Sequence, residues 1–251
     1  MTSKNTVGVV LAGGEGSRLR PLTYYFQKCM IPIGPRQRPL LEYIILNMKR
    51  AGLNDVFTLV GYKAEQIINY FREGQLYGIR IKYIHDNPEL KGTGGALLNL
   101  YRQERLEDKD IILIHYGDIL SNIDLADVIK KHEEARAEAT VALSRRYVLP
   151  VGVAEVSDDR IISFTEKPSI DIYVSIGILA LNAGVLPELD KLAAEKNSLD
   201  IMSDFIPYLL RSRRLVKPYV TDAFWYDVGS IEKYEKLTNE LVKKYLAELE
   251  D

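Results

Sequence analysis

Cysteine and histidine are scarce in this sequence of 251 residues, and its net charge is close to zero. The single cysteine, Cys29, excludes an internal disulfide and any metal cluster built from cysteines. The three histidines, His85, His115 and His132, are widely separated and lack the spacing of metal ligands. The 33 basic and 35 acidic residues nearly cancel, which argues against a nucleic-acid partner bound through a basic face. Any anion must therefore be bound by local placement of charge.

Long apolar runs are also missing. No window reaches the roughly 18 apolar residues that predict a transmembrane helix, and the apolar run near the N-terminus is too short and too interrupted by glycine for a signal peptide. We therefore expect a cytoplasmic protein without a membrane partner. Hydrophobic residues make up 47% of the chain, enough for a large core. Because no repeat or linker is evident, we expect one domain over residues 1–251.

Short apolar runs alternate with amphipathic stretches in the first part of the chain. The β-branched runs 7–12 and 111–116 suit strands buried on both faces of a parallel sheet, and 40–52 has apolar residues at helical spacing. This alternation predicts an α/β fold with a doubly wound, mostly parallel sheet. After about residue 150 strands dominate, which predicts an antiparallel portion covering the substrate. Residues 230–249 predict one C-terminal packing helix, capped by Ser230.

The segment VVLAGGEGSRLRPLT, residues 9–23, leaves a predicted buried strand through three glycines and then carries two arginines. Glycine allows backbone N–H groups and a phosphate to approach closely. A dinucleotide fingerprint needs a third glycine where Leu19 stands, and a Walker loop needs a Gly-Lys-Ser/Thr sequence that is absent. The loop alone leaves two alternatives open: a nucleotide-binding loop of another kind, or a surface turn with incidental arginines.

Further motifs follow this loop. Lys28 comes shortly after it, and then GTGGAL at 92–97, YGDIL at 116–120, VGVAEV at 151–156, FTEKP at 164–168 and WYDVGS at 225–230. In this order, over nearly the whole chain, they resemble the motifs of sugar-1-phosphate nucleotidylyltransferases, the nucleotide-sugar pyrophosphorylases. The resemblance implies a Rossmann-like, glycosyltransferase-A-type three-layer sandwich with a mixed, mostly parallel central sheet. It also implies a nucleotide-binding half over about 1–145, a sugar-binding half over about 146–230, and a short form without the C-terminal β-helix of many members.

The resemblance also implies a reaction. A nucleoside triphosphate and a sugar 1-phosphate would give a nucleoside-diphosphate sugar and pyrophosphate, with Mg²⁺ as cofactor and in-line attack at the α-phosphorus. Such a reaction depends on positioning and on neutralising phosphate charge. Arg18, Lys28 and Asp118 are the implied catalytic residues, and Asp118 and Asp227 the implied metal ligands, since Mg²⁺ prefers carboxylates together with substrate phosphates. Without the resemblance, the cations suit a solvated surface and the aspartates suit turns or helix caps.

Two sets of binding residues are implied in the same way. The nucleotide set is Leu11, Ala12, Gly13, Gly14, Gly16, Gly92, Thr93 and Gly94, and the sugar-phosphate set is Gly152, Glu166, Lys167 and Gly177. One departure concerns Lys28, which is flanked by Gln27 and Cys29 where the family usually has prolines. The family commonly forms dimers or tetramers, so a homo-oligomer is an expectation here.

Other functions stay open. One is a regulatory subunit that binds nucleotide sugars without catalysis, and another is a nucleotidyltransferase acting on a non-sugar phosphate. An NAD-dependent oxidoreductase is disfavoured by Leu19. The presence of Arg18, Lys28, Asp118 and Asp227 favours catalysis. GTGGAL resembles the loop of guanylyl-transferring members more than that of thymidylyl-transferring ones, but it does not fix the base or the sugar.

Overall fold

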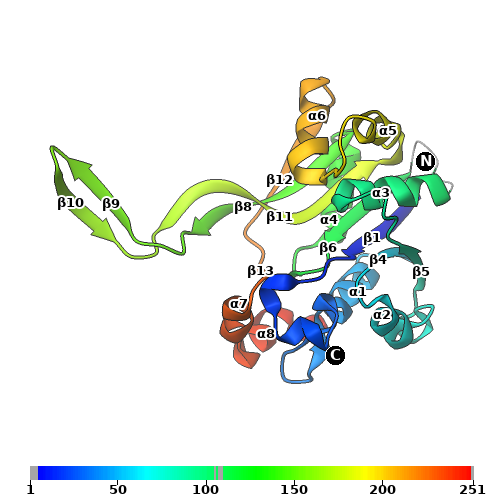
Figure 1. Cartoon of the computed structure of the whole chain (residues 1–251), viewed down its shortest axis with the longest axis horizontal. Helices are drawn as coiled ribbons and strands as arrows, with labels where there is room; N and C mark the ends of the chain where they lie inside the picture. Colours follow the sequence, from blue (N-terminus) through cyan, green and yellow to red (C-terminus); the bar gives the residue numbers. More distant parts are fainter. Residues whose placement is uncertain (1–4, 105, 107–109, 250–251) are drawn as a thin grey trace.

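A mixed sheet forms the centre of the computed structural model, which describes residues 5–104, 106 and 110–249. Figure 1 shows this sheet between two groups of helices. Its strand order is β12-β8-β11-β6-β1-β4-β5. The strands are β1 (Thr6–Ala12), β4 (Asp55–Val60), β5 (Arg80–His85), β6 (Ile111–Tyr116), β8 (Ala139–Val148), β11 (Ser169–Asn182) and β12 (Val216–Thr221). Only β11 is paired antiparallel to its neighbours in this sheet as described, so the predicted mostly parallel sheet is confirmed.

Helices cover both faces of the sheet. One apolar core joins it to α1 (Leu40–Arg50), α2 (Ala64–Phe71), α4 (Leu125–Glu134) and α8 (Asn239–Leu246). A second core, on the other face, joins it to α3 (Gly92–Gln103), α5 (Pro187–Ala193) and α6 (Ile206–Arg211). Neighbouring β1 side chains supply the two cores, Val10 on one side and Val9 on the other, and both are fully buried. This explains the continuous apolar runs and confirms the three-layer sandwich.

Shorter elements connect these layers. The strand pairs are β2 (Pro32–Ile33) with β3 (Arg38–Pro39), β7 (Ile119–Ser121) with β13 (Trp225–Asp227), and β9 (Val153–Ser157) with β10 (Arg160–Thr165). Single turns of 3₁₀-helix are η1 (Ser17–Leu19), η2 (Leu22–Tyr24), η3 (Lys28–Met30), η4 (Gln75–Tyr77), η5 (Ala183–Val185) and η7 (Ala247–Leu249), and η6 (Ile201–Phe205) is a π-turn. Within the ranges given above, no helix combines the length and the apolar character needed to cross a bilayer.

The C-terminal helix differs from the prediction because it is interrupted. Ser230 caps α7 (Ile231–Lys236), as expected, by accepting a hydrogen bond from the Lys233 amide. Leu237 is buried and leaves the helical conformation, and Thr238 then caps α8 by accepting from the Leu241 amide. The second cap explains the break, because a threonine hydroxyl can satisfy a free amide at the start of a new helix.

The strands β8 and β11 continue beyond the sheet as a two-stranded ribbon. Figure 1 shows this ribbon projecting away from the rest of the molecule, with β9 and β10 at its tip. At the tip, Asp158 and Asp159 form a two-residue turn between the paired residues Ser157 and Arg160. Both aspartates have positive φ, the geometry that suits the twist of a tight hairpin. We call residues 145–175 the arm. The predicted antiparallel pairing is therefore confirmed, but this portion extends outward and does not cover the body.

Candidate active site

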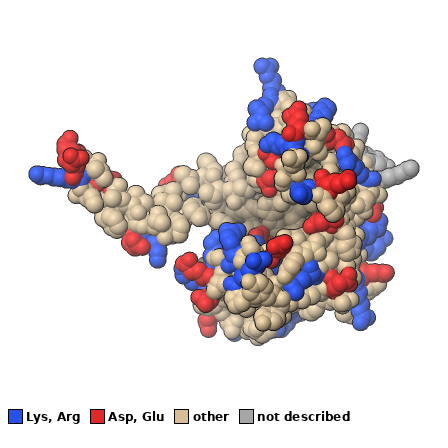
Figure 2. Space-filling view, viewed as in Figure 1, with Lys and Arg blue, Asp and Glu red and all other residues tan. Residues whose placement is uncertain are grey.

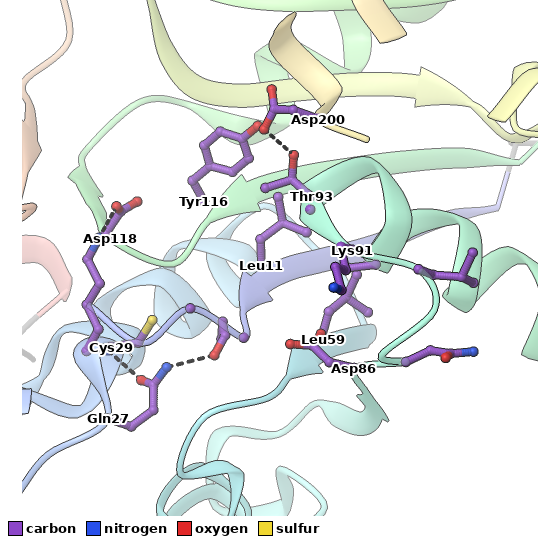
Figure 3. Close-up of a pocket in the computed structure, with 18 of the residues that line it drawn as sticks. Leu11, Gln27, Cys29, Leu59, Asp86, Lys91, Thr93, Tyr116, Asp118 and Asp200 are labelled. Atoms are coloured by element: carbon purple, nitrogen blue, oxygen red, sulfur yellow. Dashed lines mark hydrogen bonds and ion pairs between the residues drawn. The ribbon is translucent and has the colours of Figure 1, made fainter. Parts of the chain in front are cut away.

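A pocket of about 680 Å³ opens at the carboxyl ends of β1, β4, β5 and β6 (Figure 3). This edge is where open α/β sheets bind ligands, because the loops leaving the strands form a crevice there. The residues lining it are Leu11, Ala12, Gly13, Gly14, Gln27, Lys28, Cys29, Leu59, Asp86, Asn87, Pro88, Leu90, Lys91, Gly92, Thr93, Ala96, Tyr116, Asp118, Asp200 and Met202. Two predicted groups thus meet here: the loop after β1 with Lys28 and Asp118, and the start of α3.

Lys28 and Asp118 form an ion pair at one end of this pocket (Figure 3). Gln27 positions the lysine, because its buried side chain donates to the Ala12 carbonyl (2.7 Å) and accepts from the Cys29 amide (2.5 Å). These two bonds tie the segment before and after Lys28 to the end of β1. Hydrogen bonds thus restrain the lysine's neighbours where the family usually has prolines.

Asp118 immediately precedes β7 and Asp227 ends the adjoining strand β13, although the two residues are far apart in the sequence. The β7–β13 pairing places Asp227 opposite Ile119, and the Val228 amide donates to the Asp118 carbonyl at 2.8 Å. Asp227 pairs with Lys233 of α7, as Asp118 pairs with Lys28. Asp118 lines the pocket, whereas Asp227 is outside its lining.

The chemistry of this donor pair fits a hard divalent cation. Asp118 and Asp227 supply two carboxylates from joined backbones, and Mg²⁺ commonly takes one or two carboxylates together with substrate phosphates and water. In the part of the chain that the structure describes, no group of three or more His, Cys, Asp or Glu side chains is arranged to hold a metal. A metal here would therefore depend on the substrate for further ligands.

Arg18 lies on η1, in the glycine loop, and is exposed. Its guanidinium makes no hydrogen bond or ion pair with any residue that the structure describes. Arg20 differs, because it pairs with Glu15 at 3.5 Å and lies over the Tyr24 ring. Gly16 has φ +62°, and its carbonyl accepts from the Thr23 hydroxyl at 3.0 Å. The loop thus folds back toward Lys28 and leaves Arg18 open to solvent, outside the pocket lining.

The second glycine loop is fixed to the chain around residue 199. Gly92 has φ +83°, and a Cβ there would lie 2.3 Å from the Leu199 carbonyl oxygen. The Gly94 amide donates to that same carbonyl at 2.8 Å, so it is committed within the protein. The Thr93 hydroxyl donates to Asp200 at 2.7 Å and accepts from the Ile201 amide at 2.9 Å. The loop's glycines therefore serve close packing, and Gly92 and Thr93 reach the pocket while Gly94 does not.

Several pocket residues were not predicted. Asp86 follows β5 and lies against Gly13 and Gly61, where a Cβ would come within 2.3 Å and 2.1 Å of its carboxylate. Partial desolvation raises the pKa of Asp86, although the residue is exposed at the pocket mouth. The Tyr116 hydroxyl is buried near Asp200 (Figure 3) and has no hydrogen-bond partner among the described residues. A strand-end position is the signal that marks both residues, since ligands bind at that edge.

Two buried titratable groups lie at the pocket: Cys29 is part of its lining, and His115 precedes the lining residue Tyr116. Burial, together with the negative charge of Asp118, raises the pKa of the Cys29 thiol to about 12. Burial lowers the pKa of His115 to about 4, and its Nδ1 lies 2.8 Å from the Tyr116 carbonyl. Both groups are therefore neutral at pH 7. His115 is a strand residue in β6, as expected.

The predicted sugar-phosphate residues lie elsewhere. Gly152, Glu166 and Lys167 are on the arm, and none of the described residues that line the pocket belongs to the arm. Gly177 is on β11, within an irregular stretch of the ladder, and has φ +70°. A Cβ at Gly177 would lie 2.9 Å from the Tyr116 side chain. Gly177 therefore packs against a residue that lines the pocket, but it is not part of the lining itself.

Comparison with known families identifies this arrangement. Residues 7–244 match the family model described as "Nucleotidyl transferase". The chain belongs to the nucleotidyl transferase family. This confirms the family that the order of the motifs indicated, and two of the three relatives described next carry the names of sugar-1-phosphate nucleotidylyltransferases.

Three relatives illustrate the range of substrates. The chain is 29% identical to UTP–glucose-1-phosphate uridylyltransferase of Synechocystis sp., covering 90% of this chain and 61% of that protein. It is 29% identical to valienol-1-phosphate guanylyltransferase of Streptomyces hygroscopicus subsp. limoneus, covering 94% and 71%. It is 28% identical to mannose-1-phosphate guanylyltransferase of Mycobacterium tuberculosis, covering 97% and 66%. The chain thus spans 61% to 71% of these relatives' lengths.

Solved structures agree on the fold. A putative glucose-1-phosphate thymidylyltransferase from Bacillus anthracis aligns with a TM-score of 0.74 at 22% identity, over 95% of both chains. HddC from Yersinia pseudotuberculosis aligns with a TM-score of 0.69 at 22% identity, over 92% of this chain and 97% of that one. At such identities these likenesses concern the fold alone.

Proposed function

We propose that this protein transfers a nucleoside monophosphate from a nucleoside triphosphate to a sugar 1-phosphate and releases pyrophosphate. The pocket carries this proposal, because the glycine loop after β1, the Lys28–Asp118 pair and the start of α3 all line it. A glycine loop allows a triphosphate to approach the backbone, and a lysine and an arginine beside it can neutralise phosphate charge. The family match and the names of the relatives support the same reaction.

Each cation has a distinct part in this proposal. Lys28 binds phosphate near the reacting α-phosphorus and exchanges its contact with Asp118 for one with the substrate. Arg18, which has no partner among the described residues, binds the departing pyrophosphate. The sugar-phosphate oxygen attacks in line as pyrophosphate leaves. The protein therefore acts by holding two anionic reactants together and by stabilising the charge that develops between them.

Asp118 and Asp227 would hold Mg²⁺ in this proposal. When bound, the ion would offset phosphate charge and polarise the phosphoryl oxygens. To hold the ion, the two carboxylates would have to give up their lysine partners, Lys28 and Lys233, and the paired strands β7 and β13 would keep the two backbones together.

Pyrophosphate release tests the reaction directly. ATP, GTP, CTP, UTP and dTTP would each be combined with glucose, mannose, galactose, N-acetylglucosamine and heptose 1-phosphates, with Mg²⁺ or with EDTA. A signal for one pairing that needs Mg²⁺ would establish the reaction and name both substrates. Silence across all pairings, from a folded protein that binds nucleotide, would contradict the proposal and favour a regulatory subunit.

One relative favours a second candidate. Valienol 1-phosphate is the substrate in the name of the Streptomyces guanylyltransferase, which matches 94% of this chain. The same assay with a cyclitol phosphate, in addition to the sugar phosphates, would distinguish a transferase for non-sugar phosphates.

A further inference from the structure

The arm exposes an unusual amount of apolar surface. No residue from 145 to 175 is buried, and the structure describes all of them. Figure 2 shows charged side chains at the tip of the arm and midway along it, with stretches of uncharged surface in tan between them. Val156, Ile161 and Phe164 are 67%, 66% and 63% exposed. A two-stranded ribbon is at best marginally stable in water by itself, so this ribbon needs a surface to pack against.

The apolar side chains gather on one face of the ribbon. Ile161 is paired with Val156, and Phe164 with Ala154, so these four side chains share a face. The neighbouring pair, Ser163 with Glu155, lies on the opposite face and is polar. The ribbon is therefore amphipathic, like a strand pair that covers another surface.

Two of the predicted sugar-phosphate residues lie on this apolar face. A Cβ built on Gly152 would lie 2.5 Å from the Phe164 ring and 2.9 Å from a carboxylate oxygen of Glu166. Glu166 therefore projects beside Phe164, over Gly152. Lys167 follows immediately and has φ +49° at the bend where the tip hairpin meets the rest of the arm. Whatever surface receives the apolar face also receives Glu166.

The body of the same chain lacks these groups at its own pocket. The lining includes Lys28 and Asp118 but, among the described residues, nothing from the arm. Beside Lys28, the loop exposes three successive aromatic residues, Tyr24, Tyr25 and Phe26, which are 57%, 73% and 42% exposed. The molecule thus has an apolar ribbon that carries the predicted sugar-phosphate residues, and an apolar patch beside a pocket that those residues do not line. The arm carries the predicted sugar-phosphate residues that the pocket lacks, and the aromatic patch is an apolar surface that suits the apolar face of the arm.

We propose that the arm packs on a second copy of this chain and supplies Glu166 and Lys167 to that copy's pocket. This inference rests on the proposed function for the role of those two residues. A second copy suits the arm because it offers the same incomplete pocket and the same aromatic patch. A two-fold exchange of arms lets both apolar surfaces be covered at once, and the assembly closes at a dimer.

Association is measured first, without substrate. We expect sedimentation equilibrium of the full chain at about ten micromolar to give a dimer, as expected for an interface that buries apolar surface on both partners. Val156→Lys combined with Ile161→Lys adds charge to the apolar face and is expected to give a monomer. Ser163→Lys, on the opposite face of the same ribbon, is the matched control and should leave the dimer intact. A monomeric wild type, or a dimer that survives the double substitution, would overturn the proposal.

Mixed dimers then test whether the arm acts on the partner. Asp118→Asn damages the body and Lys167→Ala damages the arm, and each homodimer should be inactive. A dimer of one chain of each kind, purified through two different tags, contains one complete site if arms are exchanged. It should recover about half of the wild-type activity, because one of its two sites is intact. No recovery, or full activity of the Lys167→Ala homodimer, would overturn the proposal.

A reversed pairing provides the control. A wild-type chain paired with an Asp118→Asn, Lys167→Ala chain has no complete site if arms are exchanged, but one complete site if each arm folds back on its own body. We expect this dimer to be inactive, and half activity would show an arm acting within its own chain. The two hypotheses fail separately: a wild type inactive on every substrate pair contradicts the proposed function, while the sedimentation result still decides whether the arm joins two copies.

Discussion

At the scale of single residues, Arg18 and Arg20 allow a direct comparison. They are two positions apart on one loop, but Arg20 pairs with Glu15 while Arg18 has no partner among the residues described. We predict that Arg18→Ala lowers kcat about 100- to 1,000-fold, by analogy with the loss of one donor to transition-state charge. Arg20→Ala should leave kcat near the wild-type value. Steady-state kinetics of pyrophosphate release measures both, and equal effects would remove Arg18 from the catalytic set.

His115 makes a second prediction at this scale. Burial lowers its pKa to about 4, so between its unfolded value near 6.5 and about 4 the unfolded chain binds the extra proton. The stability that the neutral ring contributes is therefore present above pH 6.5 and is lost as the pH falls. We predict a loss of about 2–3 kcal/mol in the free energy of unfolding between pH 7 and pH 4.5.

Urea unfolding of the metal-free protein at several pH values checks this. His115→Gln should lose about 2–3 kcal/mol less than the wild type over the same interval, since it has no imidazole to protonate. His85→Gln, at an exposed position, should follow the wild-type profile. Parallel profiles for the wild type and His115→Gln would contradict the prediction.

At the scale of elements, the start of α3 depends on a glycine. Gly92 combines φ +83° with a contact in which a Cβ would lie 2.3 Å from the Leu199 carbonyl. We predict that Gly92→Ala lowers the free energy of unfolding by about 1–3 kcal/mol, through backbone strain and displacement of the Leu199 segment. Gly14→Ala is the control, because no described atom lies within 4 Å of a Cβ there. Urea unfolding compares the two, and similar stabilities would show that the loop relaxes without cost.

Elements also show where sequence patterns succeed. Buried runs such as the one around Val9 predict strands reliably, because the sheet is covered on both faces and the strand must be apolar throughout. The division between α7 and α8 was missed, since the apolar spacing of Ile231, Tyr234, Leu237 and Leu241 continues across it. The break depends on the hydroxyl of Thr238, a local hydrogen bond that periodicity does not register.

For the whole molecule, ligand binding provides the prediction. A nucleoside triphosphate that binds the folded pocket, and not the unfolded chain, should stabilise the protein by about 2.7 kcal/mol at 100 times its Kd. For a chain of this length that corresponds to a rise in Tm of about 5–10 °C. The rise should depend on Mg²⁺ in the wild type and lose that dependence in Asp118→Asn. A thermal scan with each nucleotide, with and without EDTA, measures it, and no shift with any nucleotide would contradict a nucleotide pocket.

Only part of the candidate site was predictable from the sequence, because the fold of the whole chain brings some of its residues to the pocket. Motif order placed Gly13, Lys28, Gly92 and Asp118, and the sheet brings these to one edge. Asp86 lies between motifs and Tyr116 was noted only as part of one, so each required the fold before its place on the pocket wall could be recognised. The outward path of the arm depends on how β8 and β11 leave the sheet together, and strand pattern alone does not specify a direction in space.

The solitary thiol has a practical consequence. Cys29 lines the pocket but is only 2% exposed and lies against Gly117, and its pKa is raised to about 12, so almost no thiolate is available to a maleimide at neutral pH. The natural chain is therefore close to a cysteine-free background. A single dye or spin label could be attached at an introduced cysteine, for example Ser157→Cys at the arm's tip, without first removing the native one. The slow rate at which Cys29 itself is labelled would then report how often the folded protein opens to expose this side chain.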